Sequence, residues 1–333
     1  MSFTPHSPNL NTTVKGEATK PTVPVSVITT CYGRNRHLYN LLTSLAAGSV
    51  SPAQVILVND DADQTKLASF GLNIMQLPTT AHTQSQAGTA TKAAVETGFD
   101  IGRNRNVGAD QASFETLIFL DVDCVVAEDF IAGIAAKLDQ HPNALLMGQP
   151  RYLTRPLSTE ESTLLADAEQ ATPMLAALSV LNPYRHNLAG DEPAIKPTQD
   201  YGAFWSLCFA ITKTQFNHIG GFDTDYVGYG AEDTDFAFMA RALDIPFYLT
   251  KDTIYHQQHS VSRPPLNHLS SIVINANRFY DKWQHWPMGG WLEQFAEMGL
   301  IDWEPIKKDA IVLTRMPTKQ EVEAAHCADA PYV

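Results

Sequence analysis

The chain has 333 residues, a hydrophobic fraction of 44% and a formal net charge of −13 at pH 7. This hydrophobic fraction is normal for a globular protein, and the length exceeds one average domain, although a single α/β domain with insertions can reach it. The acidic balance and the lack of any Lys/Arg run argue against a nucleic-acid partner, because duplex binding needs basic side chains. An anionic substrate would need a bound divalent cation to hold it.

The cysteines and the hydropathy pattern bear on the cellular compartment. Cys31, Cys124, Cys208 and Cys327 are scattered without a Cys-x-x-Cys spacing, which is typical of reduced thiols and predicts neither a disulfide framework nor a zinc cluster. No apolar run approaches the roughly 20 residues of a membrane helix, and no apolar signal segment opens the chain. We expect a cytoplasmic protein without a transmembrane segment, with peripheral contact at the inner face of the membrane left open.

The N-terminal half alternates predicted strands and helices. Residues 1–22 are rich in Thr, Pro, Asn and Ser and are expected to form a disordered tail. Strands are predicted at 23–30, 54–59, 74–77 and 116–120, helices at about 38–45, 100–112 and 128–139, and a polar surface loop at 79–93. This alternation predicts a mostly parallel sheet with helices on both faces.

Polar residues follow three of these strands, at 29–36, 59–61 and 121–123. Open α/β sheets bind ligands at the carboxyl ends of their strands. Asp121 and Asp123 are one residue apart, and alternate strand residues point the same way, so both are expected on one side. An isolated Asp-x-Asp is more often an ordinary strand end with solvated acids. Three such ends in order favour a nucleotide site.

The second half has a different character. The proline-rich residues 151–200 predict an insertion or a mobile substrate-side segment, with a helical patch near 160–181. Strands are expected at 201–212, 246–249 and 253–256, helices at about 232–243, 266–283 and 289–299, and a peripheral tail at 301–333. Glu232, Asp233 and Asp235 open a helix after a glycine- and tyrosine-rich turn. Acids at a helix start are also favoured by the helix dipole alone.

Two histidines follow the last predicted strand. His256 and His259 can bind one metal ion if the backbone turns between them. On a continuous strand they would face opposite sides. The alternative interpretation is a pair of ordinary surface histidines in a chain that has 11 of them.

The order and spacing of these motifs resemble a GT-A-fold glycosyltransferase over about residues 23–285. The motifs that carry the resemblance lie at 25–36, 55–61, 105–108, 121–123, 220–223, 228–235 and 256–259. The N-terminal half resembles the inverting enzymes of family 2. The C-terminal half resembles the galactosyltransferase segment of animal β1,4-galactosyltransferases and bacterial polysaccharide synthases. The resemblance implies a nucleotide-sugar-binding half at 23–150 and an acceptor and catalytic half, with the metal-binding segment, at 201–300.

The resemblance also implies a role for individual residues. The donor-binding residues are Thr30, Arg34, Asp60 (or its neighbour Asp61), Arg105 and Asp121. Asp123 and His259 ligate the cation, and His256 takes a ligand position that is a methionine in the galactosyltransferases. Asp233 is the general base, Glu232 orients the acceptor, and the aromatic residues Tyr229 and Trp205 contact the acceptor.

The chemistry that these roles describe is coherent. A divalent cation stabilises a leaving diphosphate, and a carboxylate with imidazoles suits Mn²⁺ (or Mg²⁺) better than an all-oxygen Ca²⁺ site. The expected reaction moves a sugar from a nucleoside diphosphate, most simply UDP, to a hydroxyl of a glycan or lipid-linked glycan, in surface polysaccharide biosynthesis, with inversion. A sugar nucleotidyltransferase is an alternative, but its glycine-rich basic loop is absent from 29–36. A catalytically silent binding protein on the same fold is another.

Overall fold

The computed structural model describes residues 20–80, 100–188, 190–306 and 308–328. Most of the predicted tail at 1–22 and most of the predicted loop at 79–93 lie outside the described residues. Within them, no helix is both long enough and apolar enough to cross a bilayer.

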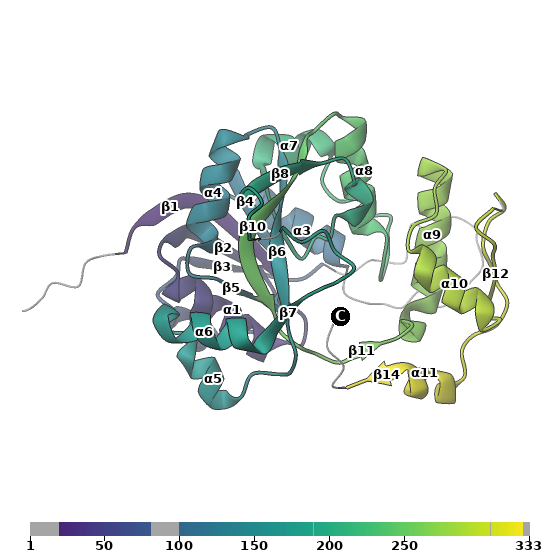
Figure 1. The fold of residues 1–333 in the computed structure, drawn as a ribbon, viewed down its shortest axis with the longest axis horizontal. Coiled ribbons are helices and arrows are strands. Elements are labelled where there is room, and N and C mark those ends of the chain that lie inside the picture. Colours follow the sequence, from purple (N-terminus) through teal and green to yellow (C-terminus); the bar gives the residue numbers. More distant parts are fainter. Residues whose placement is uncertain (1–19, 81–99, 189, 307, 329–333) are drawn as a thin grey trace, which may run out of the picture.

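A ten-stranded mixed sheet forms the centre of the molecule (Figure 1). Its main order is β3-β2-β1-β4-β9-β6-β10-β5, with β7 paired to β6 and β8 paired to β10. The strands are β1 (Thr22–Thr30), β2 (Ser51–Val58), β3 (Ile74–Leu77), β4 (Thr116–Leu120), β5 (Cys124–Val126), β6 (Leu145–Leu153), β7 (Ser179–Leu181), β8 (Ile195–Thr198), β9 (Cys208–Thr212) and β10 (Phe247–His256). Strands β3, β2, β1 and β4 are parallel, β9 is antiparallel to its neighbours β4 and β6, and β6 runs parallel to β10. The prediction of a mostly parallel sheet is confirmed.

Helices cover both faces of this sheet. They are α1 (Asn35–Ala47), α2 (Gln64–Ala68), α3 (Ile101–Asp110), α4 (Phe130–Gln140), α5 (Thr159–Leu164), α6 (Ala168–Leu178), α7 (Lys213–Ile219), α8 (Glu232–Ala242), α9 (Leu269–Trp283), α10 (Gly289–Glu297) and α11 (Lys319–Ala325). Adjacent residues of β1 belong to different cores: Val27 packs in the core that contains α1 and α4, and Ile28 in the core that contains α3 and α8. This alternation is what a strand buried on both faces requires.

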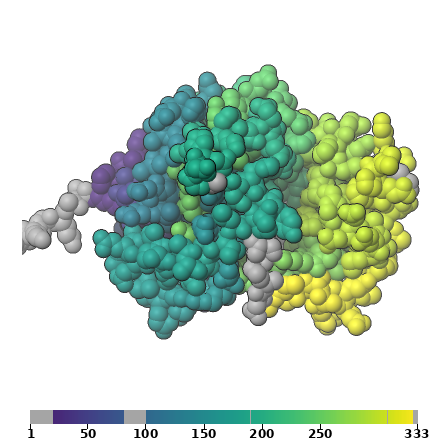
Figure 2. Space-filling view, viewed as in Figure 1, coloured from purple at the N-terminus to yellow at the C-terminus, as the bar shows by residue number. Residues whose placement is uncertain are grey.

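The C-terminal residues build a third core of their own beside the sheet. Helices α9, α10 and α11 enclose it with the two-stranded pair β12 (Ile301–Asp302) and β13 (Val312–Leu313). The last described strand, β14 (His326–Cys327), returns to pair with β11 (Val261–Ser262). Figures 1 and 2 show these residues gathered at one side of the molecule. Trp303 and Ile311, in the region expected to be a peripheral tail, are buried in this core.

Two local predictions were wrong, and strand β6 was missed. Residues 201–207 were expected in a strand, but Tyr201–Ala203 form a 3-10 turn whose Tyr201 hydroxyl donates to the carbonyl of Ile245 at 2.7 Å, and the strand begins only at Cys208. The two short strands expected near residues 246–256 are one strand, β10, with a register shift after Leu249. Strand β6 was not predicted, because Gly148 and Pro150 weaken its sequence signal.

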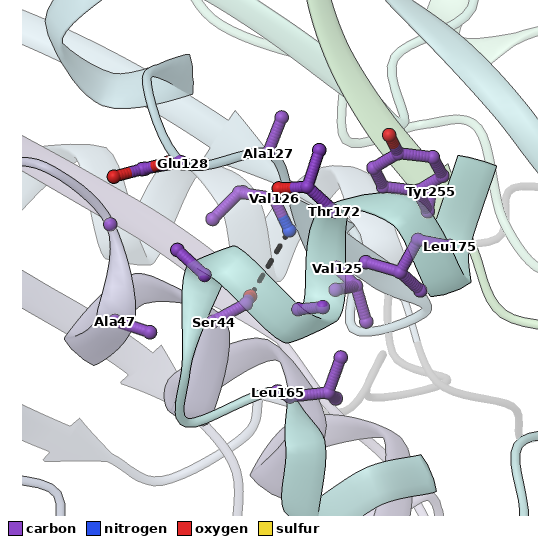
Figure 3. A pocket seen from close by; sticks show the side chains of 13 residues that line it. Ser44, Ala47, Val125, Val126, Ala127, Glu128, Leu165, Thr172, Leu175 and Tyr255 are labelled. Atoms are coloured by element: carbon purple, nitrogen blue, oxygen red, sulfur yellow. Dashed lines mark hydrogen bonds between the residues drawn. The ribbon is translucent and has the colours of Figure 1, made fainter.

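The predicted insertion at 151–200 contributes the end of β6, α5, α6, β7 and β8. Helix α6 packs on β5, where Leu175 and Tyr255 join a small apolar core. A cavity of about 10 Å³ lies at this contact. Figure 3 shows the side chains that line it and the hydrogen bond that the backbone N–H of Val126 donates to Ser44 Oγ. Such a volume is about the room of one water molecule, so this cavity is not a substrate site.

Candidate active site

The Asp121-Val122-Asp123 motif lies in a turn and not on a strand. Strand β4 ends at Leu120, and the backbone N–H of Cys124 donates to the carbonyl of Asp121 at 2.9 Å. The expectation of a continuous strand that carries both acids is therefore wrong. The turn gives the two carboxylates different neighbours, Arg105 for Asp121 and a group of histidines for Asp123.

Asp123, His256 and His259 form a candidate metal centre. Their donor atoms all lie within 4.8 Å of one another, and His259 Nε2 is 3.6 Å from Asp123 Oδ2. Strand β10 ends at His256, and the following backbone N–H, of Gln257, donates to the carbonyl of Asp123 at 2.6 Å. The chain thus leaves the strand between the two histidines, which is the condition under which they were predicted to converge.

The charge and burial of this cluster fit a divalent cation. Asp123 is 6% exposed, and its Oδ1 is buried without a hydrogen-bond partner among the described residues. Burial lowers the pKa of His256 to about 3, against the opposing effect of the Asp123 carboxylate. A neutral imidazole keeps the lone pair that metal ligation needs. One carboxylate and two neutral imidazoles are ligands that Mn²⁺ and similar ions accept.

Two arginines line the same edge of the sheet. Arg34, which precedes α1, forms an ion pair with Asp123. Arg105, on α3, is 3% exposed, and its Nη2 lies 2.6 Å from Asp121 Oδ1. Helix α3 can lie close to the sheet because Gly108 has no side chain. A Cβ at this position would lie only 2.6 Å from Ile28 Cγ2 of β1.

The residues predicted to meet the donor's base lie at the ends of two neighbouring strands. Thr30 closes β1, is buried, and is in register with Val58 of β2. Asp60 follows β2 and is exposed. The hydroxyl and the backbone N–H of Thr79 donate hydrogen bonds to Asp60, which lower the pKa of its carboxyl.

Glu232 and Asp233 open α8 after a strained turn. Ala231, the residue before the helix, has φ of +73°, which costs an L-residue about 1–3 kcal/mol. Asn275 of α9 compensates: its Nδ2 donates to the carbonyls of Val227, Tyr229 and Gly230 at 3.1, 3.2 and 3.0 Å. Because Gly230 has no side chain, the turn also packs against Met288.

Glu232 and Asp233 both have raised pKa values, but different neighbouring groups oppose the rise in each. Burial, followed by the Asp233 carboxylate, raises the pKa of Glu232 to about 7, and Arg105 opposes this rise. Burial also raises the pKa of Asp233, but the backbone N–H and hydroxyl of Thr234, the charge of Arg105 and the backbone N–H of Ser206 oppose it. Arg105 therefore acts electrostatically on the Glu232–Asp233 pair while it contacts Asp121.

The two predicted acceptor aromatics have different neighbours. Tyr229 stacks on His268, with ring centroids 4.6 Å apart, and on Trp291. Trp205 lies in the loop before β9. The guanidinium carbon of Arg185 lies over its ring, 4.2 Å from the ring centroid. Asp235, the third acid of α8, is not part of the site. It is buried, and it accepts hydrogen bonds from Tyr226, Lys282 and Trp283.

Sequence reasoning missed two residues of this region. His37, in the first turn of α1, lies with its Nδ1 4.0 Å from Asp123 Oδ1, and burial lowers the pKa of its imidazole. Asn275 holds the turn before α8. The available signal was weak in both cases: a histidine beside a helix's apolar face, and an asparagine at a buried position of an amphipathic helix.

Comparisons with known proteins agree on one enzyme class. The family model described as glycosyltransferase like family 2 matches residues 55–264. The validoxylamine A glucosyltransferase of Streptomyces hygroscopicus subsp. jinggangensis is 25% identical over 191 residues, which are 56% of this chain and 45% of that protein. The N-acetylglucosaminyl-diphospho-decaprenol L-rhamnosyltransferase of Mycobacterium tuberculosis (strain ATCC 25618 / H37Rv) is 24% identical over 287 residues, 80% of this chain and 89% of that protein. The chain thus spans less than half the length of the validoxylamine relative.

Solved structures match the fold more distantly. TarS 1–349 of S. aureus matches with a TM-score of 0.47 and 16% identity, over 78% of this chain and 66% of that one. GalNAc-T7 with UDP, GalNAc and Mn²⁺ matches with a TM-score of 0.46 and 14% identity, over 82% and 56%.

Proposed function

Because the chain belongs to the glycosyltransferase like family 2, we propose that it is a metal-dependent inverting enzyme, which moves a sugar from a UDP-sugar to a hydroxyl acceptor. The observation that carries this proposal is the position of Arg105. Its guanidinium contacts Asp121, on the donor side, and acts on the pKa values of Glu232 and Asp233, on the acceptor side. Residues proposed for the donor and for the acceptor, although far apart in the sequence, would therefore share one region at the carboxyl edge of the sheet.

The donor side uses residues from the first half of the chain. Thr30 and Asp60, at the ends of β1 and β2, are proposed to contact the base. Asp121 is proposed to contact the ribose, with Arg105 holding its carboxylate in place. Arg34 lies at the candidate metal centre, so its proposed partner is the diphosphate.

Asp123, His256 and His259 would hold the divalent cation, which when bound stabilises the charge of the leaving diphosphate. The donor set favours Mn²⁺ over a hard ion such as Mg²⁺. UDP is the proposed nucleotide carrier.

Asp233 is proposed as the general base. The hydrogen bonds from the backbone N–H groups of Thr234 and Ser206 favour its ionised form. Glu232, with a pKa of about 7, still carries its proton for part of the time at neutral pH and can donate to or accept from the acceptor. Hydrogen bonds that favour the ionised form of one acid beside a second acid with a raised pKa are typical of a base and its partner. The ionised Asp233 then takes the proton from the attacking hydroxyl as that oxygen bonds to the anomeric carbon from the face opposite the leaving group.

The proposed acceptor is a glycan or lipid-linked glycan, contacted by Tyr229 and Trp205. The mycobacterial relative, which the chain matches along 89% of its length, is named for a polyprenyl-diphosphate-linked acceptor. On this proposal, residues 23–150 bind the nucleotide sugar and residues 201–300 bind the acceptor.

A binding panel and an activity assay test the proposal. Thermal shift with UDP-, GDP- and dTDP-sugars, each with and without Mn²⁺, should show strong stabilisation by a UDP-sugar only with Mn²⁺. Slow release of UDP to water, followed by NMR of the free sugar, should give the inverted anomer first.

Asp233→Asn should still bind the donor while its turnover falls by roughly 10²- to 10⁴-fold. Asp281→Asn, an exposed acid on α9, is the matched control and should retain full turnover. Full turnover by Asp233→Asn, or retention of configuration, would contradict the assigned chemistry.

A further inference from the structure

His37 faces the candidate metal centre from a different part of the chain. It lies in the first turn of α1, more than 200 positions before His256 and His259. Its Nδ1 is 4.0 Å from Asp123 Oδ1, the buried carboxylate oxygen that has no hydrogen-bond partner among the described residues. Its ring also acts electrostatically on His256, and His259 acts on it.

The contact made by the other ring nitrogen of His37, Nε2, indicates which of the two nitrogens carries the proton. Nε2 lies 3.4 Å from the carbonyl oxygen of Gln258. A carbonyl oxygen can only accept, so Nε2 carries the proton and Nδ1 of the neutral ring presents its lone pair. Two acceptors, Nδ1 and Asp123 Oδ1, therefore face each other across 4.0 Å. A cation between them would satisfy both.

The distance between His37 and Asp123 is compatible with an ion shared by these two residues. Nitrogen and oxygen ligands bind metals such as Zn²⁺ at about 2.0–2.2 Å, so two ligands of one ion lie at most about 4.3 Å apart. The 4.0 Å between His37 Nδ1 and Asp123 Oδ1 and the 3.6 Å between His259 Nε2 and Asp123 Oδ2 both fall within this limit. His37 lies outside the group whose donor atoms are all within 4.8 Å of one another, so on this proposal its ring turns toward the other ligands when the ion binds.

Buried hydrogen bonds fix the position of His37. Gln257 Nε2 donates to the carbonyl of His37 at 3.1 Å, and Asn40 Nδ2 donates to Gln257 Oε1 at 2.7 Å. Gln257 also donates its backbone N–H to the carbonyl of Asp123. The start of α1, the end of β10 and the Asp123 turn are thus tied together, and a hydrogen bond that orients a ligating histidine is a common feature of metal sites.

We propose that His37 is a fourth protein ligand of the divalent cation, through Nδ1. This rests on the proposed function, which assigns Asp123, His256 and His259 to that cation. Three imidazoles and one carboxylate form a donor set that favours Mn²⁺, Fe²⁺, Co²⁺ or Zn²⁺ and disfavours Mg²⁺, which prefers oxygen ligands. The site therefore selects a borderline metal, and Mg²⁺ should replace Mn²⁺ poorly.

Two substitutions separate ligation from structure. His37→Gln places an amide N–H where Nε2 was, so it keeps the contact with Gln258 and removes the Nδ1 ligand. His37→Asn places its amide oxygen near the Nδ1 position and loses the contact with Gln258. His218→Gln, at an exposed position of α7, is the matched control.

The readout is Mn²⁺ binding in the absence of nucleotide. Titration followed by the EPR signal of free Mn²⁺ should show a dissociation constant at least tenfold higher for His37→Gln, a smaller change for His37→Asn, and none for His218→Gln. Pulsed EPR of the wild-type complex should count three imidazole nitrogens bound to the ion, and two in His37→Gln. Mg²⁺ should displace Mn²⁺ only at a large excess.

Other results would overturn the proposal in distinguishable ways. If Asp123→Asn weakens Mn²⁺ binding but His37→Gln does not, the proposed function stands and His37 is not a ligand. If His37→Asn weakens binding more than His37→Gln, His37 acts only through Gln258. If His37→Gln weakens only UDP binding at saturating Mn²⁺, His37 contacts the diphosphate. Absence of Mn²⁺ binding by the wild type would overturn both this proposal and the metal dependence.

Discussion

The raised pKa of Glu232 predicts that this residue lowers the free energy of unfolding at neutral pH, because its ionised form is disfavoured in the folded state. Burial beside Asp233 raises the pKa from 4.5 to about 7. An acid with a higher pKa in the folded state binds more protons there than in the unfolded state between those two pH values. Stability therefore falls as pH rises from 4.5 to 7, and it stays low above 7. Glu232→Gln, which cannot ionise, escapes this loss.

The size of the effect follows from the shift. A change of 2.5 pKa units corresponds to about 3 kcal/mol at 1.36 kcal/mol per unit. Glu232→Gln should accordingly be more stable than the wild type by about 3 kcal/mol at pH 8. The difference should shrink to about 1 kcal/mol at pH 5, where the wild-type carboxyl is protonated in the folded state.

The assay is urea denaturation of both proteins at pH 5 and pH 8, followed by far-UV circular dichroism. Comparing variant with wild type at each pH cancels the contributions of the titrating groups that do not interact with Glu232. Glu297→Gln, at an exposed position of α10, is the matched control and should shift the midpoint at neither pH. Equal stabilities of Glu232→Gln and wild type at pH 8, or the same gain at both pH values, would refute the reasoning.

Three further substitutions test the surroundings of the site. Asn275→Ala leaves the turn before α8 without its hydrogen bonds, so the free energy of unfolding should fall by about 2–3 kcal/mol and the KM for the acceptor should rise; an unchanged urea midpoint would contradict this. Gly108→Ala places a Cβ 2.6 Å from Ile28 Cγ2 and should cost about 1–3 kcal/mol, while displacing Arg105 and weakening donor binding; no rescue by the added Ile28→Leu change, which removes Cγ2, would argue against the clash. Asp235→Ala leaves the Trp283 indole N–H and the Tyr226 hydroxyl without their acceptor, whereas Lys282 keeps Asp223 at 3.6 Å, and it should cost about 2–4 kcal/mol in urea denaturation; a loss below 1 kcal/mol would show that these hydrogen bonds between α8 and its surroundings stabilise the fold little.

The sequence alone was sufficient for the regular elements near the site. The apolar runs of β1 and β2 and the leucine spacing of α1 are local patterns, and such patterns predict an element wherever it is buried. The order of polar strand ends also predicted the edge of the sheet at which the candidate site lies, because parallel strands bring their carboxyl ends together.

Other elements depend on partners that no local pattern specifies. Strand β6 contains Gly148 and Pro150 and still forms, because it is paired with β9 and β10. Glycine is the residue that fits at position 148, since a Cβ there would lie 2.4 Å from Cys208 Sγ. Residues 201–207 have the aromatic content of a strand but turn, so that Tyr201 can reach the carbonyl of Ile245. Packing overrides strand propensity in both cases.

The candidate site also has a part that the sequence could predict and a part that only the fold shows. Asp121, Asp123, His256 and His259 could be named as candidates from residue type and order. Only the folded chain shows that β4 stops at Leu120 and turns the two acids to different neighbours. Side chains brought together across more than 200 residues leave no periodic trace in the sequence, because their contact is set by how α1 and β10 pack. For the same reason His37, which supplies a lone pair opposite Asp123, became visible only in three dimensions.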